Sequence, residues 1–318
     1  MKVAVVGAGA IGGWLAARLA LDGHQVGIVP RRQAERTLAA GLLLIDQGRE
    51  QLSPVQVLES AGAAEVQDLV LIATKATDLA DAAERAQPLI GPETLIMPLQ
   101  NGVPWWFLPG ERLRSVDPEG RIAAALPPRQ VIGGVVHAAC RRPAPGTVEV
   151  VHADRLILGE PGGGLSERVE RLAEVFNAAG VPIEASANVR RAIWYKLWGN
   201  MTINPISATT GLTADRVLAE AEHRTEIAAA MEEARAVGAA IGCPIAESIE
   251  DRMSVTARLG AFKTSMLQDV EAGRPIELNA LVGAVAEIGR STGVETPTID
   301  CIEARTRDFV VARGLLPG

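Results

Sequence analysis

Aromatic residues and cysteine are scarce in this chain of 318 residues. Only 3% of the residues are aromatic, so a core must be built from alanine, valine, leucine and isoleucine. The three cysteines, Cys140, Cys243 and Cys301, lie far apart and form no C-x-x-C pair. That pattern is typical of reduced thiols in a cytosolic protein and argues against a disulfide framework. No histidine lies at metal-ligand spacing from them, and we expect no metal site.

The chain also lacks an excess of positive charge and a convincing membrane segment. A formal net charge of -7 and an isoelectric point near 5.3 give no general attraction to nucleic acid or to an anionic membrane. An anionic ligand must therefore be bound by a local cluster of lysine, arginine or backbone amides. The nearly uncharged stretch 3–21 contains a glycine-rich turn and Arg18, without a basic leader or a cleavage site. We interpret it as a strand and a helix, and expect a cytoplasmic protein.

A glycine-rich turn follows the first predicted strand, residues 2–6. The turn reads GAGAIG and consists of Gly7, Ala8, Gly9, Ala10, Ile11 and Gly12. A helical pattern and a second predicted strand, residues 25–29, come after it. In this setting Gly7 allows a tight turn, Gly9 lets a pyrophosphate approach, and Gly12 lets the helix pack closely. The helix N-terminus would then face the phosphates. We interpret the turn as a dinucleotide site, the alternative being a glycine-rich turn that binds no nucleotide.

The end of the second predicted strand indicates which dinucleotide is bound. An NAD enzyme usually offers an acidic residue there, whereas this chain has Pro30-Arg31-Arg32 and no acid before Glu35. Two guanidiniums suit a 2′-phosphate, so we predict NADPH as the cofactor and Arg31 as one of its contacts. A solvated basic corner is the alternative.

Two later strand ends also carry polar residues. The apolar run 69–74 ends at Lys75, and the predicted strand 94–98 runs into Gln100-Asn101-Gly102. The carboxyl ends of strands face the ligand crevice in an open parallel sheet, so these residues are candidate cofactor contacts. For Lys75 the alternative is a solvated lysine that begins the predicted helix 78–86.

The chain changes character near residue 186. Strand and helix patterns alternate before that point, and Ala-rich helices without strands follow it. We therefore predict an α/β fold, with a Rossmann-type NADP-binding domain over 1–186 and an all-helical substrate and dimerisation domain over 187–318. Residues 102–129 interrupt the first domain, and their triplet Trp105-Trp106-Phe107 either walls a substrate pocket or covers apolar surface. His137 and His152 have no evident acid or metal partner, and we interpret both as structural.

The strongest functional pattern lies on the first predicted helix of the second domain, residues 193–204. Lys196, Asn200 and Asn204 recur at every fourth position, and at about 100° per residue they share one face. The neighbours of Lys196 are tryptophan, leucine, methionine and isoleucine, which is unusual for a lysine on a surface helix. The amine is either functional or a buried lysine that pairs with a distant carboxylate, with the two amides capping loops.

Together these segments resemble the ketopantoate reductase (2-dehydropantoate 2-reductase) family, which are Rossmann dehydrogenases with a helical second domain. The resemblance covers nearly the whole chain. It is carried by GAGAIGG from Gly7, the basic strand end at Arg31, TK at Lys75, QNG at Gln100, HAA at His137, WYKLWGNMTINP at Trp194, SMLQD at Ser265, GRPIELN around Glu277, and VETP at Val294.

The resemblance implies NADPH-dependent reduction of a 2-oxo acid to a 2-hydroxy acid, namely 2-dehydropantoate to pantoate in pantothenate synthesis. It implies that Lys196 is the proton donor and that Glu277 meets the cofactor and the lysine. Hydride transfer to a ketone carbon leaves negative charge on the oxygen, which an ammonium can stabilise and protonate. The remaining implied contacts are Asn200, Asn204 and Ser265 for the substrate, and Lys75, Asn101 and Ala139 for the cofactor.

The chain departs from the family pattern at several positions. Ala214 and Phe262 stand where some members have asparagine, and Asn279 and Val282 stand where some have Asp-x-x-Asn. Because these polar side chains are absent, an alternative is that the chain is a family relative that reduces a different oxo acid or ketone. Two further alternatives are a non-catalytic NADP(H) sensor and an opine-type dehydrogenase that condenses an amine. The Ala-rich helix 225–240 and the apolar final helices predict a homodimer.

Overall fold

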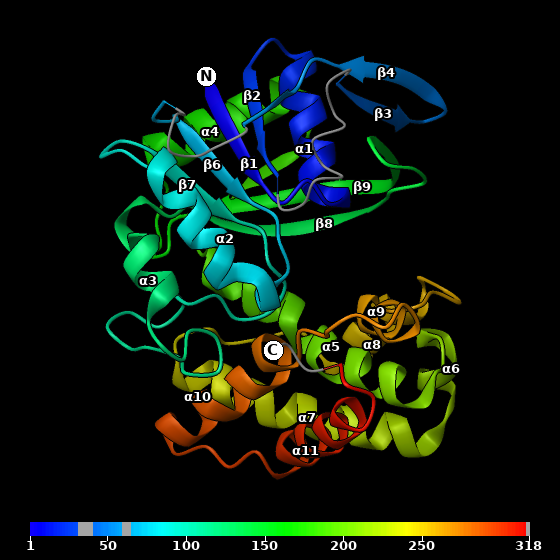
Figure 1. The fold of residues 1–318 in the computed structure, drawn as a ribbon. Helices are drawn as coiled ribbons and strands as arrows, with labels where there is room; N and C mark the ends of the chain where they lie inside the picture. Colours follow the sequence, from blue (N-terminus) through cyan, green and yellow to red (C-terminus); the bar gives the residue numbers. More distant parts are fainter. Residues whose placement is uncertain (31–40, 59–64, 316–318) are drawn as a thin grey trace. The chain divides into compact units, whose positions relative to one another are not determined.

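The computed structural model describes residues 1–30, 41–58 and 65–315 (Figure 1). The chain forms two compact units, residues 1–100 with 120–189 and residues 101–119 with 190–318. The first unit is α/β with a parallel sheet and the second is helical, so the predicted fold class is confirmed. Residues 101–119 fall inside the predicted first domain, yet they pack with the helices of the second unit.

A five-stranded parallel sheet forms the centre of the first unit. Its spatial order is β5 (Gln56–Val57), β2 (Gln25–Val29), β1 (Lys2–Val6), β6 (Leu69–Ile72) and β7 (Leu95–Pro98). Numbered along the chain within this sheet, the order is 3-2-1-4-5, which is that of the first five strands of a doubly wound fold. Val3 of β1 pairs with Val26 on one side and with Leu69 on the other. The last four residues of β1 and all residues of β6 are buried, because both faces of a parallel sheet are covered.

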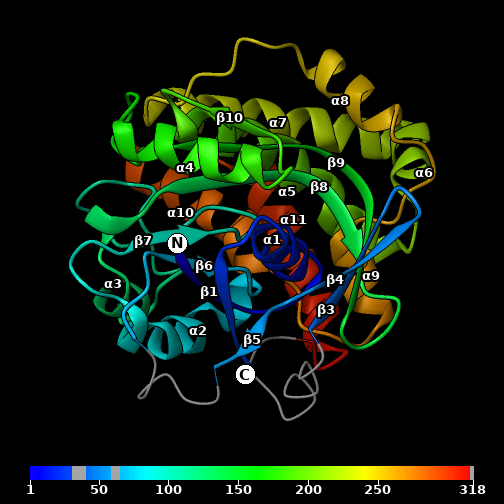
Figure 2. The same ribbon diagram turned by 90° about the horizontal axis from the view of Figure 1, so that it is seen from above.

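A second sheet completes the first unit (Figure 2). Its strands are β10 (Ile183–Ala185), β9 (Thr147–Gly159), β3 (Leu42–Asp46) and β4 (Arg49–Ser53), and β8 (Gly133–Arg141) pairs with β9. The sequence patterns of residues 148–152 and 155–158 predict two separate strands, whereas β9 is one continuous strand, and no strand was predicted over β4. Gln47 and Gly48 join β3 to β4 with positive φ angles of 49° and 74°. Such angles are typical of the tight turn of a hairpin.

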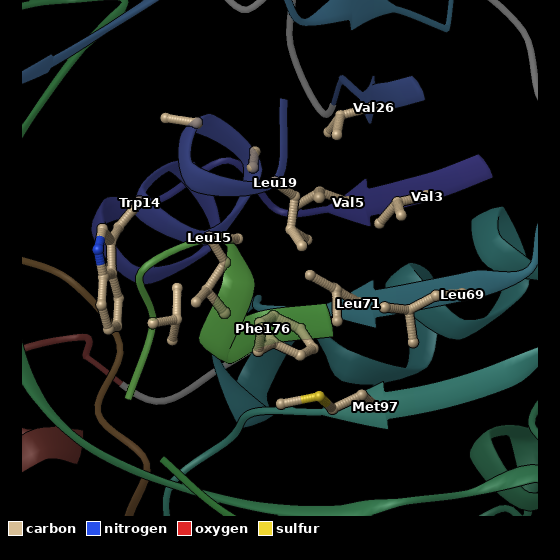
Figure 3. Packing of buried hydrophobic residues seen from close by; sticks show 14 of the residues in the cluster. Val3, Val5, Trp14, Leu15, Leu19, Val26, Leu69, Leu71, Met97 and Phe176 are labelled. Carbon is tan, nitrogen blue, oxygen red and sulfur yellow. The ribbon is translucent and has the colours of Figure 1, made fainter. Parts of the chain in front are cut away.

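The core of the first unit lies around helix α1 (Ala10–Leu21). Figure 3 shows Trp14, Leu15 and Leu19 of α1 with side chains from β1, β2, β6 and β7, and with Phe176 of α4. These contacts fix α1, the helix that begins in the glycine motif, against the parallel sheet. The remaining helices of this unit are α2 (Leu79–Ala86), α3 (Arg121–Ala125), α4 (Glu167–Ala178), and the short η3 (Ala76–Asp78), η4 (Gln87–Leu89) and η5 (Pro128–Gln130).

Helices make up the second unit, and α5 (Val189–Thr210) runs into it from the first. The others are α6 (Ala214–Ala219), α7 (Ala221–Ala240), α8 (Ile249–Ala257), α9 (Ser265–Glu271), the π-helical turn η6 (Asn279–Gly283), α10 (Ala284–Thr292) and α11 (Pro297–Val311). The sequence pattern of residues 213–242 predicts one continuous helix, and this prediction is wrong, because Glu220 is extended (φ −85°, ψ 124°) between α6 and α7. None of the helices in the described ranges is long and apolar enough to span a membrane.

The segment 101–119 is attached to the second unit by both apolar and polar contacts. The ring of Phe107 stacks on Trp194 of α5, with centroids 5.8 Å apart. The backbone N–H groups of Arg114 and Ser115 donate to the carboxylate of Glu287 in α10, each at 2.7 Å. The aromatic triplet was expected either to wall a substrate pocket or to cover apolar surface. Phe107 does the second, because its side chain is fully buried.

Candidate active site

Lys196 lies on α5 and donates a hydrogen bond from Nζ to Oδ1 of Asn101, at 2.7 Å. The two residues are 95 positions apart in sequence, but both belong to the second unit. The backbone next to Asn101 is held closely: Val103 N donates to Ala280 O of η6 at 2.9 Å. Gly102 has φ +93°, and a Cβ there would lie 2.5 Å from the same Ala280 oxygen. Only glycine fits this backbone, so the turn fixes the amide that contacts the lysine.

The electrostatic surroundings of Lys196 adjust its proton affinity. The pKa of its ammonium is lowered from 10.5 to about 8, mainly by burial; the carboxylate of Glu277 opposes this shift, and the guanidinium of Arg252 contributes to it. Glu277 is 9% exposed and lies two residues before η6. A pKa of about 8 keeps the amine largely protonated at neutral pH while making it a better acid than an ordinary lysine. The structure thus brings together Lys196, Asn101 and Glu277, three of the residues predicted from the sequence.

The other predicted substrate contacts lie on two helices of the same unit. Asn204 lies on α5 and is 6% exposed. Asn200 precedes it by about one helical turn and Lys196 by about two. Ser265 is exposed at the first position of α9, whose N-cap Thr264 accepts a hydrogen bond from Leu267 N at 3.2 Å. Their roles toward a substrate stay predictions.

Arg252 is a neighbour of this group that sequence reasoning missed. It lies on α8, with its guanidinium centred 5.6 Å from the ring of Tyr195, and its Nη1 donates to Thr256 Oγ1 at 2.9 Å. A Cβ at Gly199 of α5 would lie 2.2 Å from Nη2. An arginine on an amphipathic helix carries no signal of its own in the sequence. The one hint is the glycine in the helix interior, where a missing side chain leaves room for a neighbour.

The glycine-rich turn occupies the end of β1 in the first unit. Gly7 has φ +97°, and a Cβ there would lie 2.7 Å from Thr74 Cγ2. A Cβ at Gly12 would lie 2.1 Å from the carbonyl oxygen of Gly7, whereas one at Gly9 would meet no atom within 4 Å. Gly9 is the N-cap of α1, and no side chain caps the helix and no acid stands in its first turn. The described residues thus supply no side-chain cap and no acidic group to the first N–H groups of α1, and such N–H groups are a suitable site for an anion.

The neighbouring strand ends carry polar groups. Gln100, after β7, donates through Nε2 to the carbonyl oxygens of Ile72 (2.8 Å) and Thr74 (3.0 Å), after β6. The buried atoms Thr74 Oγ1 and Gln100 Oε1 have no hydrogen-bond partner within the described part of the chain. Unsatisfied buried polar atoms are uncommon and are expected where a ligand completes the site. Lys75 follows directly as the N-cap of η3. These residues fit a dinucleotide.

Three predicted features need separate mention. Arg31 lies outside the described residues. Ala139 is an exposed residue of β8 and pairs with His152 of β9. The described ranges include no group of three or more His, Cys, Asp or Glu residues that could hold a metal ion.

Both halves of the chain are similar in sequence to known proteins. Residues 3–163 match the family described as ketopantoate reductase PanE/ApbA, and residues 188–308 match its C-terminal part. A 2-dehydropantoate 2-reductase of Mesorhizobium japonicum is 43% identical, over 99% of this chain and 99% of its own length. A 2-dehydropantoate 2-reductase of Methylococcus capsulatus has a crystal structure that superposes with a TM-score of 0.85, at 32% identity and 98% coverage of both chains. A candidate ketopantoate reductase of Ralstonia solanacearum superposes with a TM-score of 0.95, at 47% identity and 99% coverage of both.

Proposed function

Because this chain belongs to the ketopantoate reductase family, we propose that it reduces a 2-oxo acid to the 2-hydroxy acid with a nicotinamide cofactor, 2-dehydropantoate being the proposed substrate. The observation that carries the proposal is the hydrogen bond of Lys196 to Asn101, beside the carboxylate of Glu277. A partly buried lysine with a lowered pKa, on one helical face with two amides, is suited to proton transfer.

The chemistry divides between the cofactor and the protein. The cofactor, when bound, supplies the hydride. The role of Lys196 is to donate a hydrogen bond to the ketone oxygen, to stabilise the negative charge that develops there, and to give up its proton. Asn101 orients the ammonium through its Oδ1. Glu277 keeps the amine protonated by opposing the effect of burial.

NADPH is the proposed cofactor. Its pyrophosphate would be bound by the N–H groups at the start of α1, beside Gly9. Thr74 Oγ1 and Gln100 Oε1, which have no partner among the described residues, are available to the rest of the cofactor. The preference for the 2′-phosphate depends on Arg31 and Arg32, as predicted from the sequence. The proposal also includes a homodimer.

A specific observation favours a second candidate, a relative that reduces another 2-oxo acid. Ala214 and Phe262 replace the asparagines of some family members, and the two positions are adjacent: Ala214 N donates to Phe262 O at 3.0 Å. The change therefore affects one place in the second unit. Ala214 is fully buried and Phe262 is half-buried, so a polar pair would be replaced by an apolar surface.

A kinetic assay tests the proposal. The purified protein is mixed with NADPH or NADH and with 2-dehydropantoate or one of several other 2-oxo acids, and loss of absorbance at the nicotinamide band is followed. We expect turnover of 2-dehydropantoate and a preference for NADPH. Faster turnover of another oxo acid would favour the second candidate. Tight NADPH binding without turnover of any oxo acid would contradict an enzymatic role and leave a sensor, and turnover only with an added amine would indicate an opine-type dehydrogenase.

A further inference from the structure

Among the described residues, the guanidinium of Arg252 has no acidic partner. Its only side-chain hydrogen bond in the described ranges runs from Nη1 to the hydroxyl of Thr256, at 2.9 Å. Its Nε is buried and has no partner there. Burial lowers the pKa of this arginine, and the phenol of Tyr195, not a carboxylate, is the group that opposes the shift. A partly buried cation without a counter-ion is costly, so its presence calls for an anion that the described residues do not supply.

The position of this cation relative to Lys196 is set by α5. Tyr195 and Gly199 are one helical turn apart on α5, and both contact the guanidinium. The ring of Tyr195 lies 5.6 Å from it, and the absence of a side chain at Gly199 leaves the space that it occupies. Lys196 and Asn200 form the next row of the same helix. The charge of Arg252 is close enough to lower the pKa of Lys196. Two cations therefore lie at neighbouring rows of α5, and the carboxylate of Glu277 acts on one of them, Lys196.

We propose that Arg252 binds the carboxylate of the substrate while Lys196 contacts its ketone oxygen. The inference rests on the proposed function and adds a residue that determines the substrate class. In a 2-oxo acid the carboxylate is bonded directly to the carbonyl carbon, so a cation for the carboxylate must lie beside the proton donor. Nε and Nη2 of one guanidinium form a fork that matches the two oxygens of a carboxylate. These are the two nitrogens of Arg252 that donate to no described residue.

A purely structural role is the competing explanation. In that case Arg252 would connect α8 to α5 through Tyr195 and Thr256, and its loss would affect every substrate to the same extent. A carboxylate-binding role affects only substrates that carry the negative charge. The two explanations therefore differ in the ratio of activities toward an acid and toward its uncharged ester.

The test compares 2-dehydropantoate with its methyl ester, which keeps the ketone and removes the charge. We expect the wild-type protein to prefer the acid in kcat/KM. Arg252→Met should reduce kcat/KM for the acid on the order of 10²-fold, mainly through KM, and change that for the ester far less. Arg252→Lys, which keeps the charge but loses the fork, should recover part of the preference. Arg258→Met is the matched control, because Arg258 is exposed at the C-cap of the same helix.

A second variant leaves Arg252 in the chain. Gly199→Ala would place a methyl group 2.2 Å from Nη2 and displace the guanidinium, while alanine favours the helix more than glycine does. It should abolish the preference for the acid without lowering the melting temperature. Equal losses on acid and ester in Arg252→Met, or an unchanged preference in both variants, would overturn the proposal. If the wild-type protein reduces no 2-oxo acid at all, the proposed function itself fails, and the two failures are thus distinguishable.

Discussion

At the scale of single residues, the ionisation of Lys196 should control the pH dependence of the reaction. Reduction needs the protonated amine, and burial lowers its pKa to about 8. Below that value the ammonium is present, and as the pH rises through it the proton is lost. We therefore expect kcat/KM for reduction to fall above about pH 8, and oxidation of the hydroxy acid, which needs the neutral amine, to rise over the same range. Initial rates of reduction and of oxidation, measured between roughly pH 6 and 10, report both changes.

Substitutions at the same site should shift or remove this dependence. Lys196→Ala should lower turnover on the order of 10²–10⁴-fold and remove the alkaline limb. Glu277→Gln should move the midpoint to lower pH, because Glu277 raises the pKa of the lysine. Lys263→Ala is the control, since that lysine is exposed and pairs with Glu271. Near-normal reduction by Lys196→Ala would contradict the assignment of the proton donor.

The sequence revealed only part of this site. The spacing of Lys196 along α5 could be read directly, because the period of a helix fixes which residues share a face. Asn101 was expected, through the resemblance, to be a cofactor contact, but its contact with Lys196 depends on a chain path 95 residues long that local patterns do not encode. Arg252 carried no signal, since its effect comes from the space left by a glycine on another helix.

At the scale of elements, strands with continuous apolar runs were predicted best. β1 and β2 have the predicted bounds, because buried parallel strands leave an unambiguous pattern. Breaks without proline or glycine were missed, as at Glu220 between α6 and α7. The π-helical turn η6 was also missed, although its Ala280 oxygen receives the hydrogen bond that holds the backbone next to Asn101. Such turns often occur at functional sites.

In the turn between β1 and α1, one glycine is required by the fold and another is expected to be required by the cofactor. Gly9→Ala adds a methyl group that meets no atom within 4 Å, so the melting temperature should stay close to that of the wild-type protein. If a pyrophosphate approaches there, the same methyl group should weaken NADPH binding by about tenfold or more. Gly12→Ala instead places a Cβ 2.1 Å from a backbone oxygen and should destabilise the first unit.

Thermal unfolding and fluorescence titration with NADPH measure the two effects separately. Gly23→Ala is unsuitable as a control, because Gly23 has φ +89°, whereas Gly162 has no such constraint and no neighbour within 4 Å. Gly162→Ala should leave both quantities unchanged. Undiminished NADPH affinity in Gly9→Ala would count against a dinucleotide at this turn.

At the scale of the whole molecule, the chain crosses between its two units more often than the composition suggests. The change to helices near residue 186 is visible in the sequence, and α5 begins close to it. The passage of residues 101–119 to the second unit is not visible, because an aromatic triplet between strands has no period that points to a partner. Its destination is set by tertiary contacts, such as Phe107 on Trp194 and the carboxylate of Glu287 on two backbone N–H groups.

This path predicts how fragments of the chain behave. A fragment of residues 1–189 keeps the segment 101–119 but loses the helices that it packs against, which would uncover Trp105, Trp106 and Phe107, now at most 6% exposed. An apolar patch of this kind promotes association. We expect the fragment to self-associate, as measured by size-exclusion chromatography with light scattering. A matched fragment in which a Gly/Ser linker of equal length replaces 101–119 should be monomeric and still bind NADPH, because the glycine turn and the five parallel strands lie outside the replaced segment. If the fragment that keeps residues 101–119 were also monomeric, the apolar side chains of this segment would be covered without the helices of the second unit. The packing of 101–119 against those helices would then not explain how Asn101 is held beside Lys196.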